Sequence, residues 1–269
     1  MRTVRPKYVG VALLAIGSAV LVTACGRSAE TTARKEFAQV YAINPDATFS
    51  LANFSGSVVI HGSDLPQLEV KAIITATNSQ RLNGITVDVK ARDDRAAINT
   101  IFPPEKRRVG ASGGQVDYVL RLPRTVRISQ LEIENGRVSI EGMRSPDLNA
   151  RVVDGSLSVH NCLGDARLAV SSGSLELSYD SLEQDPFFVS ALIIHGNARV
   201  VMPTGSPLHL LADASSGKVI NHLAETVELN GHSSSRVDMK IGPNTRPDFE
   251  IRATMGDIEI LPVKALAKE

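Results

Sequence analysis

The chain has 269 residues, which is enough for one large domain or two ordinary ones. Its 29 basic and 29 acidic side chains give a formal net charge of zero, which argues against the clustered basic excess of a nucleic-acid-binding protein. Aromatic residues make up 4% and Trp is absent, so stacking platforms for bases or sugars are scarce. With 43% hydrophobic residues, the chain can build a sizeable core.

The N-terminal residues 1–24 have the three parts of a bacterial lipoprotein signal peptide. Basic residues precede an uncharged, aliphatic run over 9–24, which is too short for a comfortable bilayer-spanning helix. The run leads into a segment that resembles a lipobox, Val22-Thr23-Ala24-Cys25. We therefore predict signal cleavage between Ala24 and Cys25 and lipid attachment at Cys25. An ordinary signal peptide or a short membrane anchor is the alternative.

Lipidation at Cys25 predicts an anchored protein rather than a membrane-spanning one, because palmitate-type acyl chains insert into the bilayer. The expected location is the bacterial cell envelope, on the outer membrane facing the periplasm if the host has two membranes. Residues 25–45 are mostly polar and are predicted to be a lipidated tether, with a short helix around 31–40. With Cys25 acylated, Cys162 has no disulfide partner, and we interpret it as a small apolar core residue.

Beyond residue 46 the hydrophobic residues alternate with a period of two, which is typical of β-strands with one buried face. The runs around 68–74, 85–89 and 116–122 show this alternation, and Gly, Pro, Asn or Asp bound each of them. No amphipathic helix stands out after the tether. The sequence therefore predicts an all-β protein, in which residues 46–125 form an N-terminal antiparallel portion.

Residues 126–264 repeat a short template in which an apolar strand, a glycine and a second apolar strand follow one another. Its copies are centred on Gly136, Gly155, Gly173, Gly196, Gly217 and Gly256. A period of roughly 20 residues indicates stacked units, each unable to bury its own hydrophobic face. Glycine suits corners that need a positive φ or that stack too closely for a Cβ atom. The repeat favours a β-solenoid or β-helix-like portion, and a meander of hairpins is the alternative.

The stretch over 116–142, together with the two units that follow it, resembles the putative-adhesin family of bacterial envelope proteins, a domain family of unknown function. The shared pattern is a strand that ends in Leu122-Pro123, followed by serial glycine units. The resemblance covers roughly 49–262 and implies one β-solenoid-like domain without catalytic residues. The segment 179–190 departs from the pattern, because it lengthens one connection.

Catalytic motifs are absent from the sequence, which has no nucleophile elbow, P-loop, zinc-protease helix or Cys-x-x-Cys pair. The six histidines show no ligand spacing, so no metal or other cofactor is expected. Paired carboxylates of a glycan-cleaving enzyme are the main enzymatic alternative, because β-helices can carry them. The acids at or near predicted turns are Asp154, Asp213, Asp238 and Asp257, which we interpret as solvated or turn-capping residues.

The segment 103–114 is the most distinctive exposed loop that the sequence predicts. Lys106, Arg107 and Arg108 lie there between a Pro pair and a Gly-rich exit, and form a candidate anion-binding loop for phosphate or carboxylate groups. The alternative is a solvated hairpin tip whose charges protect a sheet edge.

Together these features predict a lipid-anchored envelope protein with a non-enzymatic, adhesin-like or scaffolding role. The expected partners are the membrane, through the lipid, and an envelope polysaccharide or envelope protein, but no nucleic acid. One alternative is a glycan-active enzyme, which needs two carboxylates in one cleft. The other is a periplasmic carrier of lipid or lipopolysaccharide, which needs an open apolar groove between its sheets.

Overall fold

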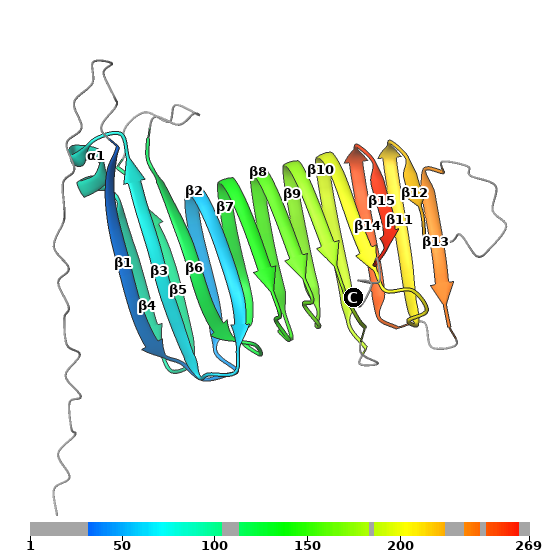
Figure 1. Cartoon of the computed structure of the whole chain (residues 1–269), viewed down its shortest axis with the longest axis horizontal. Coiled ribbons are helices and arrows are strands. Elements are labelled where there is room, and N and C mark those ends of the chain that lie inside the picture. Colours follow the sequence, from blue (N-terminus) through cyan, green and yellow to red (C-terminus); the bar gives the residue numbers. More distant parts are fainter. Residues whose placement is uncertain (1–31, 104–112, 183–185, 224–233, 243–245, 264–269) are drawn as a thin grey trace, which may run out of the picture. The chain divides into compact units, whose positions relative to one another are not determined.

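The structure is a computed structural model that describes residues 32–103, 113–182, 186–223, 234–242 and 246–263 (Figure 1). All its elements belong to the unit formed by residues 31–269. They are β1 (Ala33–Ala42), β2 (Thr48–Ser63), β3 (Gln67–Ala76), α1 (Ser79–Gly84), β4 (Thr86–Arg92), β5 (Arg95–Ile101), β6 (Gln115–Pro123), β7 (Arg127–Glu141), β8 (Leu148–His160), β9 (Ala166–Ser178), β10 (Phe188–Met202), β11 (Leu208–Ser216), β12 (Val219–Asn221), β13 (Arg236–Ile241), β14 (Asp248–Met255) and β15 (Ile258–Pro262). The predicted all-β class is confirmed. Among these described residues, no helix is long and apolar enough to cross a membrane.

The strands form one mixed sheet that is not closed on itself. Its main path runs β1-β3-β6-β2-β7-β8-β9-β10-β14-β11-β13. Pairing is parallel from β2 through β10 to β14 and β11, and antiparallel between β1 and β3, β3 and β6, β4 and β5, and β11 and β13. The antiparallel arrangement predicted for 46–125 is therefore right for β3–β6 and β4–β5. It is wrong for β2, which pairs in parallel with β5, β6 and β7.

Four of the glycine units, β7 to β10, are each one long strand that bends at its glycine, and in the other two the glycine lies between a pair of shorter strands. In β8 the buried residues are Leu148, Ala150 and Val152 before Gly155, and Leu157 and Val159 after it. We call the residues before the glycine the first arm and those after it the second arm. Buried residues are two positions apart within each arm and five apart across the glycine, so the bend turns both arms toward one core. The sequence alternation thus gives two arms that belong to the one sheet and face a shared interior.

The unit glycines lie directly against one another in a column. Gly136 pairs in register with Gly155, which pairs in register with Gly173. A Cβ atom on Gly155 would lie 1.7 Å from the carbonyl oxygen of Gly136, and the φ angle of Gly155 is +140°. Glycine is therefore required on both of the grounds that the sequence suggested. Because neighbouring units pair in parallel, they stack on one another, and the hairpin alternative is wrong for them.

The units do not stack in chain order. The unit of Gly256, made by β14 and β15, pairs with β10 on one side and with β11 and β12, the unit of Gly217, on the other. In addition, β2 is a further copy that was not predicted, since its Gly56 pairs in register with Gly136. The segment Leu51–Ile60 fits the template, except that buried Asn53 takes an apolar position.

Residues 33–42 are a strand, so the helix predicted around 31–40 is wrong. Within β1, Ala33, Phe37 and Tyr41 are half-buried and packed against the core, a spacing of four that imitates a helix. In a strand every second residue points to the same face, so the residues midway between these three also point inward. They are polar, because β1 lies at the sheet edge.

Candidate binding groove

Two adjoining depressions lie on the outside of the first arms, with volumes of about 310 and 340 Å³. They share Glu132 of β7 and Arg151 of β8, so we treat them as one feature, the outer groove. Its first depression is lined by Ser129, Gln130, Leu131, Glu132, Asn149, Ala150, Arg151, Arg167, Leu168, Ala169 and Ser190. Its second is lined by Ala52, Asn53, Phe54, Asn99, Thr100, Glu132, Ile133, Glu134, Arg151 and Val153.

The in-register parallel pairing creates the groove. Ala52 pairs with Glu132, Glu132 with Arg151, and Arg151 with Ala169, so these four side chains form one row across β2, β7, β8 and β9. The two alanines are short, while Glu132 and Arg151 are long and exposed. A groove therefore crosses the strands where small side chains leave space between longer ones.

A bulge in β7 adds polar groups to the first depression. The register shifts between Ile128 and Leu131, which are both buried, while Ser129 and Gln130 between them are both exposed. The Ser129 hydroxyl donates to the backbone oxygen of Phe49 at 3.1 Å. The bulge thus directs two consecutive side chains outward, where regular pleating would direct only one.

The second depression lies where β5 and β2 separate. Their last paired residues are Ala52 and Asn99, after which β2 bends toward its glycine. The Phe54 and Phe102 rings meet edge to face across this point, with centroids 5.7 Å apart. Asn53 holds the bend, because its amide nitrogen donates to the backbone oxygen of Val116 at 2.9 Å. The depression therefore has an apolar wall beside polar groups.

A buried hydroxyl pair supports the same depression from below. Thr100 and Tyr118 are both buried, and their hydroxyl oxygens lie 2.6 Å apart in a hydrogen bond. Burial raises the pKa of Tyr118 to about 12, and the hydrogen bond with Thr100 offsets part of this rise. Tyr118 stays neutral at any physiological pH and serves as a fixed support.

The charged residues of the groove differ in how firmly they are held. Arg167 pairs with Asp147 at 3.3 Å, and Asn149 donates to the same carboxylate at 3.1 Å. Arg151 and Glu132 form no ion pair with any other described residue. Arg151 can therefore offer its planar set of N–H donors to a carboxylate or phosphate, while the neighbouring amides both donate and accept.

Two sets of predicted residues lie outside the described residues: those of the lipid-attachment signal and those of the anion-binding loop. These are Ala24 and Cys25 of the signal, and Lys106, Arg107 and Arg108 of the basic loop.

The four acids singled out in the sequence are spread over the fold and line neither depression. Asp154 is exposed beside the Gly155 corner. Asp213 approaches Arg236 at 3.8 Å, and Asp257 accepts from the backbone N–H of Lys218 at 2.8 Å, which joins it to the corner of the neighbouring unit rather than to its own turn.

Asp238, the fourth of these acids, forms a cluster with a histidine. His209 Nε2 lies 2.9 Å from Asp238, and His209 Nδ1 lies 3.0 Å from Asp248. The hydrogen bond from His209 lowers the pKa of Asp238. Within the described ranges, no three His, Cys, Asp or Glu side chains converge on a point that could hold a metal ion.

Cys162 is a core residue, as predicted. It is 4% exposed and its thiol lies 3.5 Å from the backbone oxygen of His160. Burial raises its pKa to about 12, so very little of the nucleophilic thiolate forms near neutral pH.

The outer groove itself was not predicted, because its polar residues come from several strands and form no motif in the chain. One signal was available: Gln130 follows Ser129 where strict alternation would place a single outward residue. A count of outward positions between Ile128 and Leu131 would have located the bulge.

No family model matches the chain, and no curated protein matches it. The fold is similar to that of a putative cell adhesion protein from Clostridium sporogenes. The two share a TM-score of 0.52 and 14% sequence identity, over 85% of this chain and 100% of that chain. A putative adhesin from Bacteroides fragilis is a more distant neighbour, with a TM-score of 0.33 and 8% identity over 84% of this chain and 97% of that chain. The likeness to the Clostridium protein is one of fold.

Proposed function

We propose that this chain is a lipid-anchored bacterial envelope protein that binds a partner without chemical turnover, in an adhesin-like or scaffolding role. The lipobox ending at Cys25 supports the anchor. The tether predicted over 25–45 includes β1, which begins at Ala33, so eight residues separate Cys25 from the sheet, and eight residues span at most about 26 Å. A tether of that length lets a folded body stand clear of lipid headgroups.

We further propose that the stacked units are the rungs of a β-solenoid. Each unit contributes two arms, one bend and one return connection, as the Gly155 unit illustrates. A stack of this kind is rigid, because each rung is hydrogen-bonded to its neighbours along its whole length. Rigidity suits a binding surface, since its side chains need little ordering when a partner arrives.

The observation that carries the binding proposal is the outer groove. It crosses six strands, from Asn99 of β5 to Ser190 of β10, which corresponds to about 24 Å at 4.8 Å per strand. Its shape suits an extended polymer more than a compact ligand. Arg151 has no ion-pair partner among the described residues, and Gln130 and Asn149 stand beside it. We propose an envelope polysaccharide with hydroxyl and carboxylate or phosphate groups.

The two alternative functions have less support in the geometry. Among the described residues, the space between the arms is occupied by buried Val, Leu and Ile side chains and the outer groove lies outside it, which gives little support to a lipid carrier. Glu132 and Glu134 are the closest approach to paired carboxylates in the groove. Both are exposed, whereas a general acid in a glycosidase needs an apolar, water-poor setting.

The test of the groove compares two exposed arginines. Acidic polysaccharide isolated from the host envelope is titrated calorimetrically into the full chain, into Arg151→Ala and into Arg199→Ala. Arg199 is a matched control, because it is exposed on the second arm of β10 and lines neither depression. Losing a charge-assisted contact costs about 1.5–3 kcal/mol, so Arg151→Ala should weaken Kd roughly ten- to a hundredfold. Equal affinities of both variants, or no binding by the full chain, would refute the groove.

The anchor has a separate test. Metabolic labelling with a fatty acid should mark the unaltered chain and leave Cys25→Ala unlabelled, and the variant should move from the membrane to the aqueous fraction. A control replacement, Cys162→Ala, should keep both the label and the membrane location. Labelling of Cys25→Ala would refute attachment at this cysteine.

A further inference from the structure

The described part of the sheet ends in four edge strands, and β1 differs from the other three. The main path of the sheet ends at β1 on one side and at β13 on the other. Off this path, β4 pairs only with β5, and β12 pairs with β15 and has a single bridge, Val219 to Ser234, on its other side. An unpaired edge presents free backbone N–H and C=O groups to any other strand. Proteins usually protect such edges with charges, irregularity or short length.

Three of the edges are protected in these ways. The seven-residue β4 carries Asp88, Lys90 and Arg92, and Lys90 lies 3.3 Å from Asp88. The six-residue β13 alternates charged and apolar residues, beginning at Arg236. The third edge, β12, has three residues, so it offers few backbone groups.

The C-terminal half of β1 has no such protection. The charges of this ten-residue strand lie in its first half, where Arg34 pairs with Glu36 at 2.8 Å. From Phe37 to Ile43 the chain has no charge, no Pro and no Gly. Val40 at its centre is 59% exposed, the highest value among the large hydrophobic residues of the described ranges.

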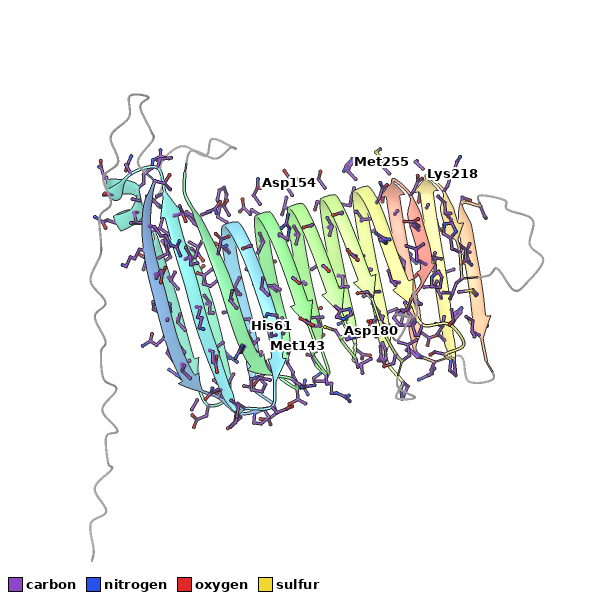
Figure 2. All side chains as sticks on the ribbon, in the orientation of Figure 1. His61, Met143, Asp154, Asp180, Lys218 and Met255 are labelled. Atoms are coloured by element: carbon purple, nitrogen blue, oxygen red, sulfur yellow. The ribbon has the colours of Figure 1, made fainter. Side chains whose placement is uncertain are left out.

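The helix α1 leaves this half uncovered. It follows β3 at Ser79, and β3 ends at Ala76, which is the register partner of Ala33 at the start of β1. Figure 1 shows α1 at this end of β1, and Figure 2 shows the side chains along the strand. The helix contacts β1 and β3 there, beside the charged half.

We propose that β1 is the strand through which two copies of this protein pair, antiparallel and centred on Val40. The uncharged stretch is symmetric about that residue, with three residues on each side. In this register Val40 faces its own copy, Ala38 faces Ala42, and Phe37 faces Ile43. No charge lies opposite a like charge, because every charged residue of β1 falls outside the paired segment. A two-fold axis makes the contact self-complementary and closed, so pairing stops at two copies.

Cysteine cross-linking tests the register on the full chain in its own membrane. Antiparallel partners directly opposite one another have Cα atoms about 4.5–5.5 Å apart, which is within disulfide range. Val40→Cys should therefore form a covalent dimer under mild oxidation. Met255→Cys is the matched control, because Met255 is also exposed, at 54%, and lies at the glycine corner of another unit.

The expected result is a dimer band for Val40→Cys that forms about tenfold faster or more than for Met255→Cys, because pairing raises the effective concentration of the thiols. The unaltered chain supplies the background from Cys25 and Cys162. Equal rates for the two variants would overturn the proposal, and so would a cross-link between Val40→Cys and a different protein. As a second measurement, light scattering on the detergent-solubilised chain should give twice the protein mass for the unaltered chain and a single mass for Val40→Lys. A single mass for both would also overturn it.

Discussion

The glycine column makes a prediction whose size follows from the structure. In Gly155→Ala the new Cβ atom would lie 1.7 Å from the carbonyl oxygen of Gly136, which is backbone and cannot swing away. The φ angle of +140° is an additional cost for any L side chain. Backbone strain of this kind costs about 1–3 kcal/mol, and forcing an extra carbon into a packed site costs about 1–3 kcal/mol more. We expect a loss of about 2–6 kcal/mol, a large part of a typical domain stability.

Two other glycines separate the two costs. Gly142 also has a positive φ, +67°, but a Cβ atom there would meet nothing within 4 Å. Gly142→Ala should therefore show strain without the clash, and less strain than Gly155→Ala, because φ near +67° lies in the left-handed region that L residues can adopt. Gly113 has open space as well, and no positive φ is found for it, so Gly113→Ala should be close to neutral.

The assay is urea unfolding of the three variants beside the unaltered chain, with thermal melting as a second measurement. At about 2–4 °C per kcal/mol for a domain of this size, the additional clash should lower the Tm of Gly155→Ala by roughly 2–12 °C relative to Gly142→Ala. If Gly155→Ala were no less stable than Gly142→Ala, the argument that close stacking requires glycine would be wrong.

Three further predictions concern the core and the titrating groups. Leu157→Ala should lower the free energy of unfolding, measured in urea, by about 2–5 kcal/mol, because Leu157 is 1% exposed. The control Val153→Ala, at an exposed position, should change it by less than about 0.5 kcal/mol. Similar losses for the two variants would contradict the buried position of Leu157. Cys162 should resist iodoacetamide at pH 8 in the native chain and react once the chain is unfolded, since burial raises its pKa to about 12. Mass spectrometry follows the labelling. Rapid labelling of the native chain would show an accessible thiol and contradict the prediction. The lowered pKa of Asp238 means that its contribution to stability is present above its ordinary pKa of 3.8 and is lost as the pH falls through the lowered value. Urea midpoints measured from pH 5 downward should therefore fall more steeply for the unaltered chain than for Asp238→Asn, and parallel curves would contradict the bond to His209.

Much of the local structure could be predicted because it follows from side-chain order. Alternating apolar residues such as Leu68, Val70 and Ala72 can bury one face only in an extended chain, and all three are buried in β3. The repeated glycines marked the bends for a similar reason, since no other residue tolerates the backbone and the space at Gly155. These are properties of each segment by itself.

The candidate groove could not be predicted, because no single segment contains it. Its row of Ala52, Glu132, Arg151 and Ala169 exists only once four strands stand in register. Each of these residues is unremarkable in the chain, where an exposed Glu or Arg on a strand is ordinary. The basic loop could be proposed as an anion site from the sequence, because its three charges are consecutive and need no strand pairing to come together.

The sequence alone determined that the chain beyond residue 46 is built of strands, where the recognised glycine units bend and which of their residues face the core, because alternation and backbone freedom act over a few neighbouring residues. Only the tertiary structure decided the order of the stack, with the Gly256 unit between those of Gly196 and Gly217, and the membership of β2 and β1 in the sheet. The reason is that ladder hydrogen bonds use the backbone, which is the same in every strand. The choice of neighbour therefore depends on how all the units pack together, and no residue of one strand encodes it.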